Sequence, residues 1–175
     1  MRSVRQNVFE TNSSSTHSLT FVSKTNKNMY TLSESGYLEA GFDEYYSEFY
    51  YDTYSTVEEK LRFLLTLLSS FYYGFKQNEA FKKTGRWVNV QYTTQKELKS
   101  LPEFKEIQKL VKKNIPNCKG LRFRKNSFLV SGEVSGGMDS HHHQDCSNLQ
   151  SYLKKNNVTL EQFLFSPNII IQMNV

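Results

Sequence analysis

The sequence predicts an α+β fold: a single domain over residues 1–175, with a mixed or antiparallel sheet packed against two or three helices. Segments that alternate apolar and polar residues lie near both ends of the chain, and two segments with helical spacing lie in its middle. No internal repeat or long low-complexity linker divides it. A length of 175 residues is enough for one domain with a core and argues against two.

The first strands are expected near the N-terminus. The alternation in SLTFVS predicts a strand over 18–23, and NMYTLS over 28–33 is its expected hairpin partner across a polar turn. An acidic, tyrosine-rich segment follows over 36–54. Its β-propensity is high, and its carboxylates would keep it soluble where it is exposed.

The clearest helix is STVEEKLRFLLTLLSSFYYGF, in which leucines recur at helical intervals. Ser55 or Thr56 can cap its N-terminus. Glu58 or Glu59 stands three positions further, which is the spacing of a capping box. Gly74 is the expected end of this helix.

LPEFKEIQKLVKKNIP predicts a second helix, with Pro102 in the first turn and Pro116 after the end. Its apolar stripe is Phe104, Ile107, Leu110 and Val111. The lysines of its other face, Lys105, Lys109, Lys112 and Lys113, are interpreted as a solvated surface.

Five elements are expected in the last third of the chain. KGLRFRKNSFLVSGEV predicts two strands around a turn at Lys125 and Asn126. The middle of MDSHHHQDCSNLQSYLKKNN predicts a helix, TLEQFLFS predicts a short helix, and NIIIQMNV predicts a buried last strand.

Composition limits the compartment and the partners. No apolar run is long enough for a membrane span, and the first residues have no apolar signal region. Two cysteines, Cys118 and Cys146, form no disulfide framework, so we expect a protein of the cytoplasm with no membrane partner. Residues 1–59 hold 4 Lys/Arg and 9 Asp/Glu, whereas the basic portion over 60–175 holds 18 and 8. A chain charged in this way can offer an acidic and a basic face to different partners.

All four histidines lie in two unusual stretches: His17 in NSSSTHS, and the run of His141, His142 and His143 in GGMDSHHHQD. Histidine is the usual side chain for proton transfer near neutral pH. If the two stretches meet, His17 and a histidine of the run could act as base and acid in metal-independent RNA cleavage. Asp139 could fix the tautomer of a neighbouring imidazole.

The serine-rich stretch is interpreted as the wall of a phosphate pocket. Its hydroxyls and backbone N–H groups could cradle a phosphate, as oriented donors do, and Arg5 could steady the charge. The residues expected there are Asn12, Ser13, Ser14, Ser15 and Thr16.

A metal site is the alternative for the same residues, so the cofactor is expected to be either none or a divalent metal ion. The candidate ligands are His17, Asp139 and a histidine of the run such as His142, with Glu10 nearby. Their spacing matches no established zinc pattern.

Two basic segments also contain aromatic residues, a combination that single-stranded nucleic acid favours. FKKTGRWVNVQYTT and KGLRFRKNSF contribute the candidate contacts Lys82, Lys83, Arg86, Trp87, Arg122, Arg124 and Lys125. The competing interpretation is the plain inside–outside alternation of a strand.

The string RQNVFETNSSSTHSLTF resembles the start of a family of small proteins from bacteriophages and mobile elements of Firmicutes-type bacteria, and the C-terminal strings MDSHHHQDCSNLQSYL and TLEQFLFSPNIIIQMN resemble theirs too. The two ends cover roughly a third of the chain. The recurring residues, at their positions here, are Phe9, Glu10, Asn12, Ser13, Ser14, Ser15, His17, Asp139 and Gln144. The resemblance implies a phage accessory role in the host bacterial cytosol, and the size is similar to that of anti-CRISPR proteins. By analogy with inhibitors that damage the guide RNA of type II nucleases, it implies an RNA or an RNA-guided nuclease complex as partner.

A non-catalytic inhibitor is the alternative function. The acidic stretch over 42–52, with Asp43, Glu44, Glu48 and Asp52, could occupy the nucleic-acid groove of such a nuclease because carboxylates can take phosphate sites. A nucleotide-using transferase is less favoured because the chain lacks a glycine-rich phosphate loop.

Overall fold

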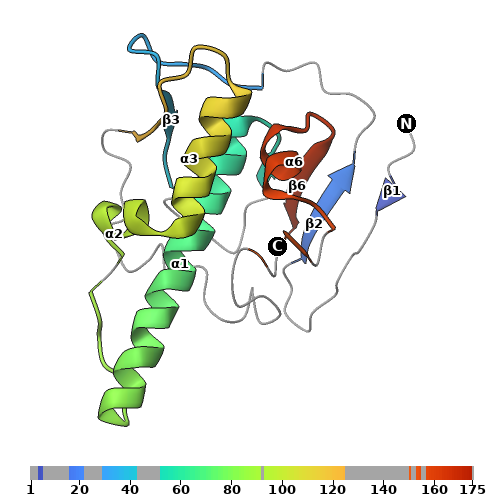
Figure 1. The fold of residues 1–175 in the computed structure, drawn as a ribbon. Coiled ribbons are helices and arrows are strands. Elements are labelled where there is room, and N and C mark those ends of the chain that lie inside the picture. The colour runs from blue at the N-terminus through green and yellow to red at the C-terminus, as the bar shows by residue number, and fades with distance from the viewer. Residues whose placement is uncertain are drawn as a thin grey trace.

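The computed structural model describes residues 4–5, 16–21, 29–42, 52–91, 93–124, 150, 153–154 and 157–174. They form an α+β fold, as predicted (Figure 1). In chain order the elements are β1 (Val4–Arg5), β2 (Thr16–Phe21), β3 (Leu38–Ala40), β4 (Asp52–Tyr54), α1 (Val57–Thr84), α2 (Gln95–Ser100), α3 (Pro102–Asn114), β5 (Leu121–Phe123), α6 (Leu160–Phe165) and β6 (Ile169–Asn174).

A four-stranded sheet joins the two ends of the chain. Its order is β1–β2–β6–β4, and all neighbouring strands are antiparallel. The last strand, β6, is an inner strand of this sheet, because Ile171 pairs with Leu19 in β2 and with Tyr54 in β4. Ile169, at its start, is buried as expected.

The strand predicted over 18–23 is confirmed as β2, which begins and ends two residues earlier. The hairpin partner predicted over 28–33 is wrong. Phe21 pairs with Val4 in β1 on one side and with Ile169 in β6 on the other, so both edges of β2 are occupied there. Leu32 forms an isolated bridge with Leu38 instead.

Strands β3 and β5 form a separate parallel pair in which Leu38 lies opposite Leu121. Strand β5 confirms the first of the two strands predicted around Lys125 and Asn126, and that turn and the second strand lie outside the described residues. The tyrosine-rich segment contributes β3 and β4, while 43–51 also lies outside the described part.

Helix α1 begins at the predicted capping box. The Thr56 hydroxyl accepts a hydrogen bond from the backbone N–H of Glu59, and the Glu59 carboxylate accepts one from the N–H of Thr56 at 2.9 Å. The predicted end at Gly74 is wrong, because the helix continues to Thr84. It stops at Gly85, whose φ of 70° is the left-handed conformation that ends helices.

The first half of α1 is buried on more than one face. Leu61, Leu64 and Leu68 form one stripe, and Phe63 and Leu67 are equally inaccessible on a second face. A helix that buries apolar side chains on more than one face needs partners on each of them. Helix α1 meets this need by contacting strands of both sheets and α6.

The remaining helices follow their capping signals. Helix α3 starts at Pro102 as predicted, and α6 starts after Thr159, whose hydroxyl accepts from the N–H of Gln162. Helix α2 was not predicted, although Thr94 and Glu97 form a full capping box. In the helix expected near 138–157, the described residues 150, 153 and 154 are helical.

Lys60 is fully buried in the first turns of α1. Its Nζ donates a hydrogen bond of 2.8 Å to the carbonyl oxygen of Ser166, directly after α6. Burial lowers the pKa of the Lys60 ammonium to about 8, although the neighbouring Glu59 carboxylate acts in the opposite direction. The charged form is therefore held in the core at neutral pH at a cost in stability.

The pKa of Lys60 predicts a pH-dependent stability. Between about pH 8 and the unfolded value of 10.5, the folded protein is neutral at Lys60 while the unfolded chain is still protonated. The free energy of unfolding of the wild type should therefore rise across this window relative to that of Lys60→Met, which has no proton to exchange. Urea denaturation of both proteins at several pH values measures the difference, and a difference that does not change with pH would contradict the assignment.

Alanine at Gly74, inside α1, and at Gly85, directly after it, should change the free energy of unfolding in opposite directions. Gly74→Ala should raise the free energy of unfolding by about 0.5–1 kcal/mol, because alanine loses less backbone entropy in a helix. Gly85→Ala should lower it by about 1 kcal/mol, because its φ of 70° strains an L-residue. Neither site has a steric obstacle within 4 Å of the added carbon, so each substitution controls for the other. Thermal and urea denaturation report both changes, and equal signs would refute the explanation.

Candidate nucleic-acid interface

The predicted histidine centre is described only in part. His17 lies in β2 opposite Met173, and Asp52 lies opposite the same Met173 from β4, so these residues occupy one row of the sheet. Arg5 pairs with Thr20 in the same sheet. The other expected members, Asn12, Ser13, Ser14, Ser15, Asp139, His141, His142 and His143, lie outside the described residues. The meeting of the two histidine stretches stays a prediction.

Thr16, the last residue of the serine-rich stretch, starts β2 and pairs with Asn174. The stretch therefore leads directly into strand β2. For the metal alternative, the described residues contain no group of three His, Cys, Asp or Glu side chains placed to hold an ion, and Asp139 and His142 fall outside that part.

Of the acidic stretch proposed as a nucleic-acid mimic, Asp43, Glu44 and Glu48 also lie outside the described residues.

The predicted nucleic-acid contacts divide into two clusters. Lys82 and Lys83 lie in the last turn of α1, and Arg86 and Trp87 follow it, at the lower end of the molecule in Figure 1. Arg122 lies in β5, and Arg124 directly follows this strand. Both lie beside β3, far from the lower end of α1. Lys125 is outside the described residues.

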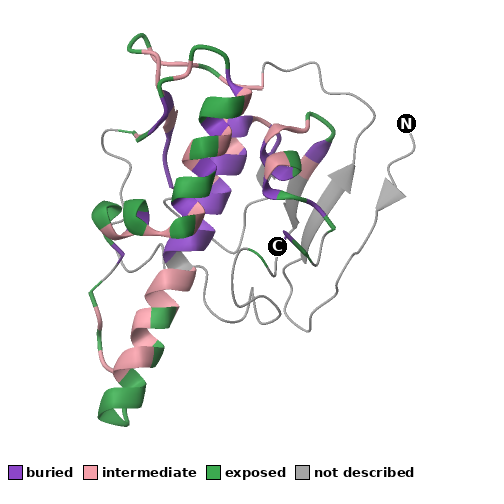
Figure 2. Cartoon of the chain, viewed as in Figure 1, coloured by how far each residue is buried: buried purple, intermediate pink, exposed green. Residues whose placement is uncertain are grey.

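The first cluster projects from the body of the protein. The C-terminal half of α1 extends beyond α2 and α3, and Figure 2 shows it half-buried to exposed where the first half is buried. We call Phe81, Lys82, Lys83, Arg86 and Trp87 the aromatic–basic tip. Trp87 is 65% exposed, the largest value among the large apolar side chains of the described residues.

Local geometry holds Trp87 in place at the tip. The left-handed Gly85 reverses the chain, and the indole comes to lie 4.7 Å from the Phe81 ring between centroids. The Thr84 hydroxyl lies 2.9 Å from the carbonyl oxygens of both Ala80 and Arg86, and its single proton can be donated to either one. The turn therefore presents a supported aromatic surface to solvent.

Cationic residues lie next to Trp87 and Phe81 in the sequence. Lys82 pairs with Glu79 at 2.9 Å, whereas Lys83 and Arg86 make no ion pair within the part of the chain that the structure describes. Both are exposed. Two cations are thus available to an anionic ligand beside Trp87.

A second aromatic pair lies about two turns before the tip. Tyr72 and Phe75 stack with ring centroids 6.3 Å apart, and the Lys76 ammonium lies 5.4 Å from the Tyr72 ring centroid. Phe75 is 59% exposed. Sequence analysis missed Phe75 and Phe81 because it ended the helix at Gly74. The glycine that follows the Lys82–Lys83 pair was the signal for the longer helix.

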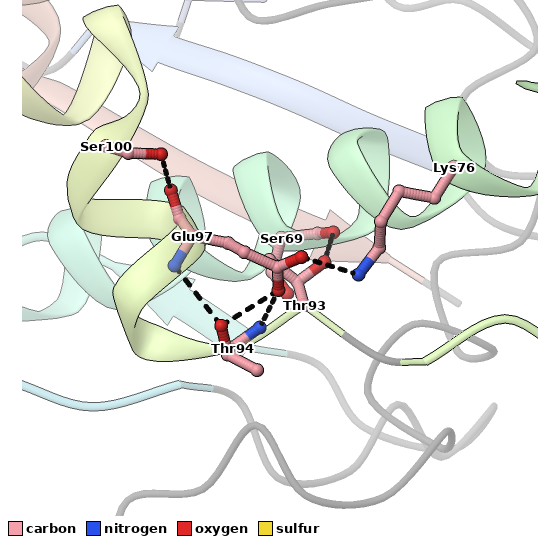
Figure 3. A network of polar contacts seen from close by, with 6 residues as sticks. All are labelled: Ser69, Lys76, Thr93, Thr94, Glu97 and Ser100. Carbon is pink, nitrogen blue, oxygen red and sulfur yellow. Dashed lines mark hydrogen bonds and ion pairs between the residues drawn. The ribbon is translucent and has the colours of Figure 1, made fainter.

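A polar network joins the middle of α1 to the segment that returns from the tip (Figure 3). The buried Thr93 hydroxyl donates to the carbonyl oxygen of Ser69 at 3.0 Å. Glu97 accepts from the backbone N–H and hydroxyl of Thr94 and forms an ion pair with Lys76 at 3.2 Å. Burial would raise the pKa of the Glu97 carboxyl, but these hydrogen bonds outweigh it and lower the pKa.

Comparisons of the chain with protein-family models, with curated proteins and with solved structures found no match. None of the helices among the described residues is both long and apolar enough to cross a membrane.

The Thr93 hydrogen bond should contribute measurably to stability. Thr93→Val keeps the shape of the side chain and removes its donor, so the free energy of unfolding should fall by about 1 kcal/mol. The matched control is Thr31→Val, at an exposed position, which should change it by less than about 0.5 kcal/mol. Urea denaturation compares the two, and equal effects would show that the Thr93–Ser69 contact adds nothing.

Proposed function

We propose that the protein binds single-stranded RNA at the aromatic–basic tip. The observation that carries this proposal is the exposed Trp87 ring, backed by Phe81. Two cations of the same turn region, Lys83 and Arg86, are exposed and have no ion-pair partners among the described residues. Base stacking on an aromatic side chain contributes about 1–3 kcal/mol per base and tolerates any sequence. Lys83 and Arg86 would contact the adjoining phosphates.

The biological setting of this proposal comes from the sequence. The similarity of both chain ends to phage and mobile-element proteins supports a counter-defence role in the bacterial cytosol, with the guide RNA of an RNA-guided nuclease as the ligand. In the full form of the proposal the protein also cleaves that RNA, with His17 and a residue of the 141–143 run as base and acid. The alternative is a stoichiometric inhibitor that acts through the acidic stretch over 42–52.

Intrinsic fluorescence tests the binding site directly, because Trp87 is the single tryptophan of the chain. Titration with an unstructured oligouridine of about 5 nucleotides should quench its emission. Trp87→Ala, followed by fluorescence anisotropy of labelled RNA, should weaken binding about 5- to 150-fold. Lys83→Ala combined with Arg86→Ala should reduce the slope of log affinity against log salt by about 1.4.

The matched control removes the same charge from α3. Lys105→Ala combined with Lys109→Ala changes two exposed lysines away from the tip and should leave the short-RNA affinity and salt slope unchanged. Binding without quenching, or equal losses in the two double variants, would refute the tip as the site.

Incubation of RNA with the wild type and His17→Ala, with and without EDTA, separates binding from cleavage. Intact RNA in the wild-type reaction would remove the catalytic part of the proposal. One-to-one inhibition of the nuclease that survives Trp87→Ala but fails when Asp43, Glu44, Glu48 and Asp52 are neutralised would favour the alternative.

A further inference from the structure

Three cations gather at the other end of the molecule, where two loops meet. One loop covers 33–37 before β3, and the other covers 117–120 before β5. The loops are joined by a hydrogen bond of 2.8 Å from the Lys119 N–H to the carbonyl oxygen of Gly36. We call Lys112, Lys119 and Arg122 the loop cations. All three side chains are exposed.

Arg122 is held in a fixed position by Tyr37. Its guanidinium carbon lies 3.3 Å from the centroid of the tyrosine ring, which is a stacking distance and sets the guanidinium plane against the ring. The N–H groups then point outward around the rim of the ring, where they can meet phosphate oxygens in pairs. Because the stack restricts the side chain in advance, less rotamer entropy is lost when it binds.

Tyr37 itself rests on a closed turn. The Ser33 hydroxyl donates to the carbonyl oxygen of Tyr37 at 3.0 Å and accepts from its N–H at 3.1 Å. The N–H of Gly36 also donates to the carbonyl oxygen of Ser33 at 2.8 Å. The platform under Arg122 is therefore built from hydrogen bonds within five consecutive residues.

Two glycines bring the lysines close to the same loops. A Cβ atom at Gly36 would lie 3.4 Å from Cε of Lys119, and one at Gly120 would lie 3.2 Å from Cε of Lys112. Both glycines have positive φ, and the missing side chains let the lysine stems lie along the backbone. Both ammonium groups are thereby kept near the junction of the two loops.

None of the loop cations forms an ion pair within the part of the chain that the structure describes. Two carboxylates are nearby in sequence or register: Glu34 is exposed in the first loop, and Glu39 lies opposite Arg122 in the parallel pair. Neither forms an ion pair with a loop cation among the described residues. The charge of this surface therefore remains available to an anion.

We infer that the loop cations form a second RNA contact, one that binds the phosphate backbone without stacking a base. The RNA ligand in this inference rests on the proposed function. The Tyr37 ring is covered by Arg122, so on that face the surface offers charge and N–H donors and no free aromatic face. It lies at the opposite end of α1 from the aromatic–basic tip, and the 28 residues of that helix span about 42 Å (Figure 1).

Contacts at two distant places predict a dependence on RNA length. An oligouridine of about 5 nucleotides is too short to span this distance and should be held at the tip alone, and one of about 40 nucleotides should reach both surfaces and bind with a steeper salt dependence. The triple variant Lys112→Ala, Lys119→Ala, Arg122→Ala should lower the salt slope for the long RNA by about 2. Trp87 quenching by the short RNA should stay at the wild-type level.

The control triple variant, Lys96→Ala, Lys105→Ala, Lys109→Ala, removes the same charge from exposed positions of α2 and α3. If it reduces the long-RNA slope as much as the loop triple variant does, or if the loop triple variant changes nothing, the second contact is refuted and the tip stands. Long-RNA binding that depends on the loop cations without Trp87 quenching would refute the tip and support the second contact. A wild type that binds neither RNA refutes both. Circular dichroism of each variant checks that the fold is retained.

Discussion

The first half of α1 buries large apolar side chains on more than one face, and the described elements are arranged to cover them. The β3–β5 pair, the four-stranded sheet and α6 each supply part of this cover, with the aromatic contacts of Tyr54 and Phe163 to Phe63 at its centre. The capping box at Thr56 and Glu59 fixes where the helix enters this environment. Even the buried ammonium of Lys60 is accommodated, through the carbonyl oxygen at the end of α6.

The second half of α1 is different because the described cover ends near Ser69. Beyond this point the helix carries Tyr72, Phe75 and Phe81 at partly or largely exposed positions, and its return segment is attached at Thr93 and Glu97. A helix fixed at its base and braced at its middle can present its end rigidly. Rigid display lowers the entropy lost on binding, which is the advantage that a stacking surface needs. The half of α1 that packs into the core and the half that carries the aromatic–basic tip are thus different parts of one helix.

The proposed RNA contacts share a construction in which an aromatic ring and a cation are held by a glycine turn. At the tip, Gly85 folds Trp87 against Phe81 with cations beside it. At the loops, Gly36 precedes Tyr37, on which Arg122 stacks. The difference lies in which group faces solvent: an indole in the first case and a guanidinium in the second. The indole favours contact with bases, and the guanidinium favours contact with phosphates.

Local signals in the sequence determined the helix starts and the class of fold. The Thr56–Glu59 box and Pro102 act within one turn of backbone, so their outcome depends on few other residues. Tertiary structure alone decided the partners of β2, the parallel pairing of β3 with β5 and the separation of Arg122 from Trp87. Periodicity identifies a strand without saying which edge it joins, because that choice depends on residues far along the chain. Gly74 is ambiguous for the same reason: a glycine can sit inside a helix or end it, and here the helix continues to the left-handed Gly85.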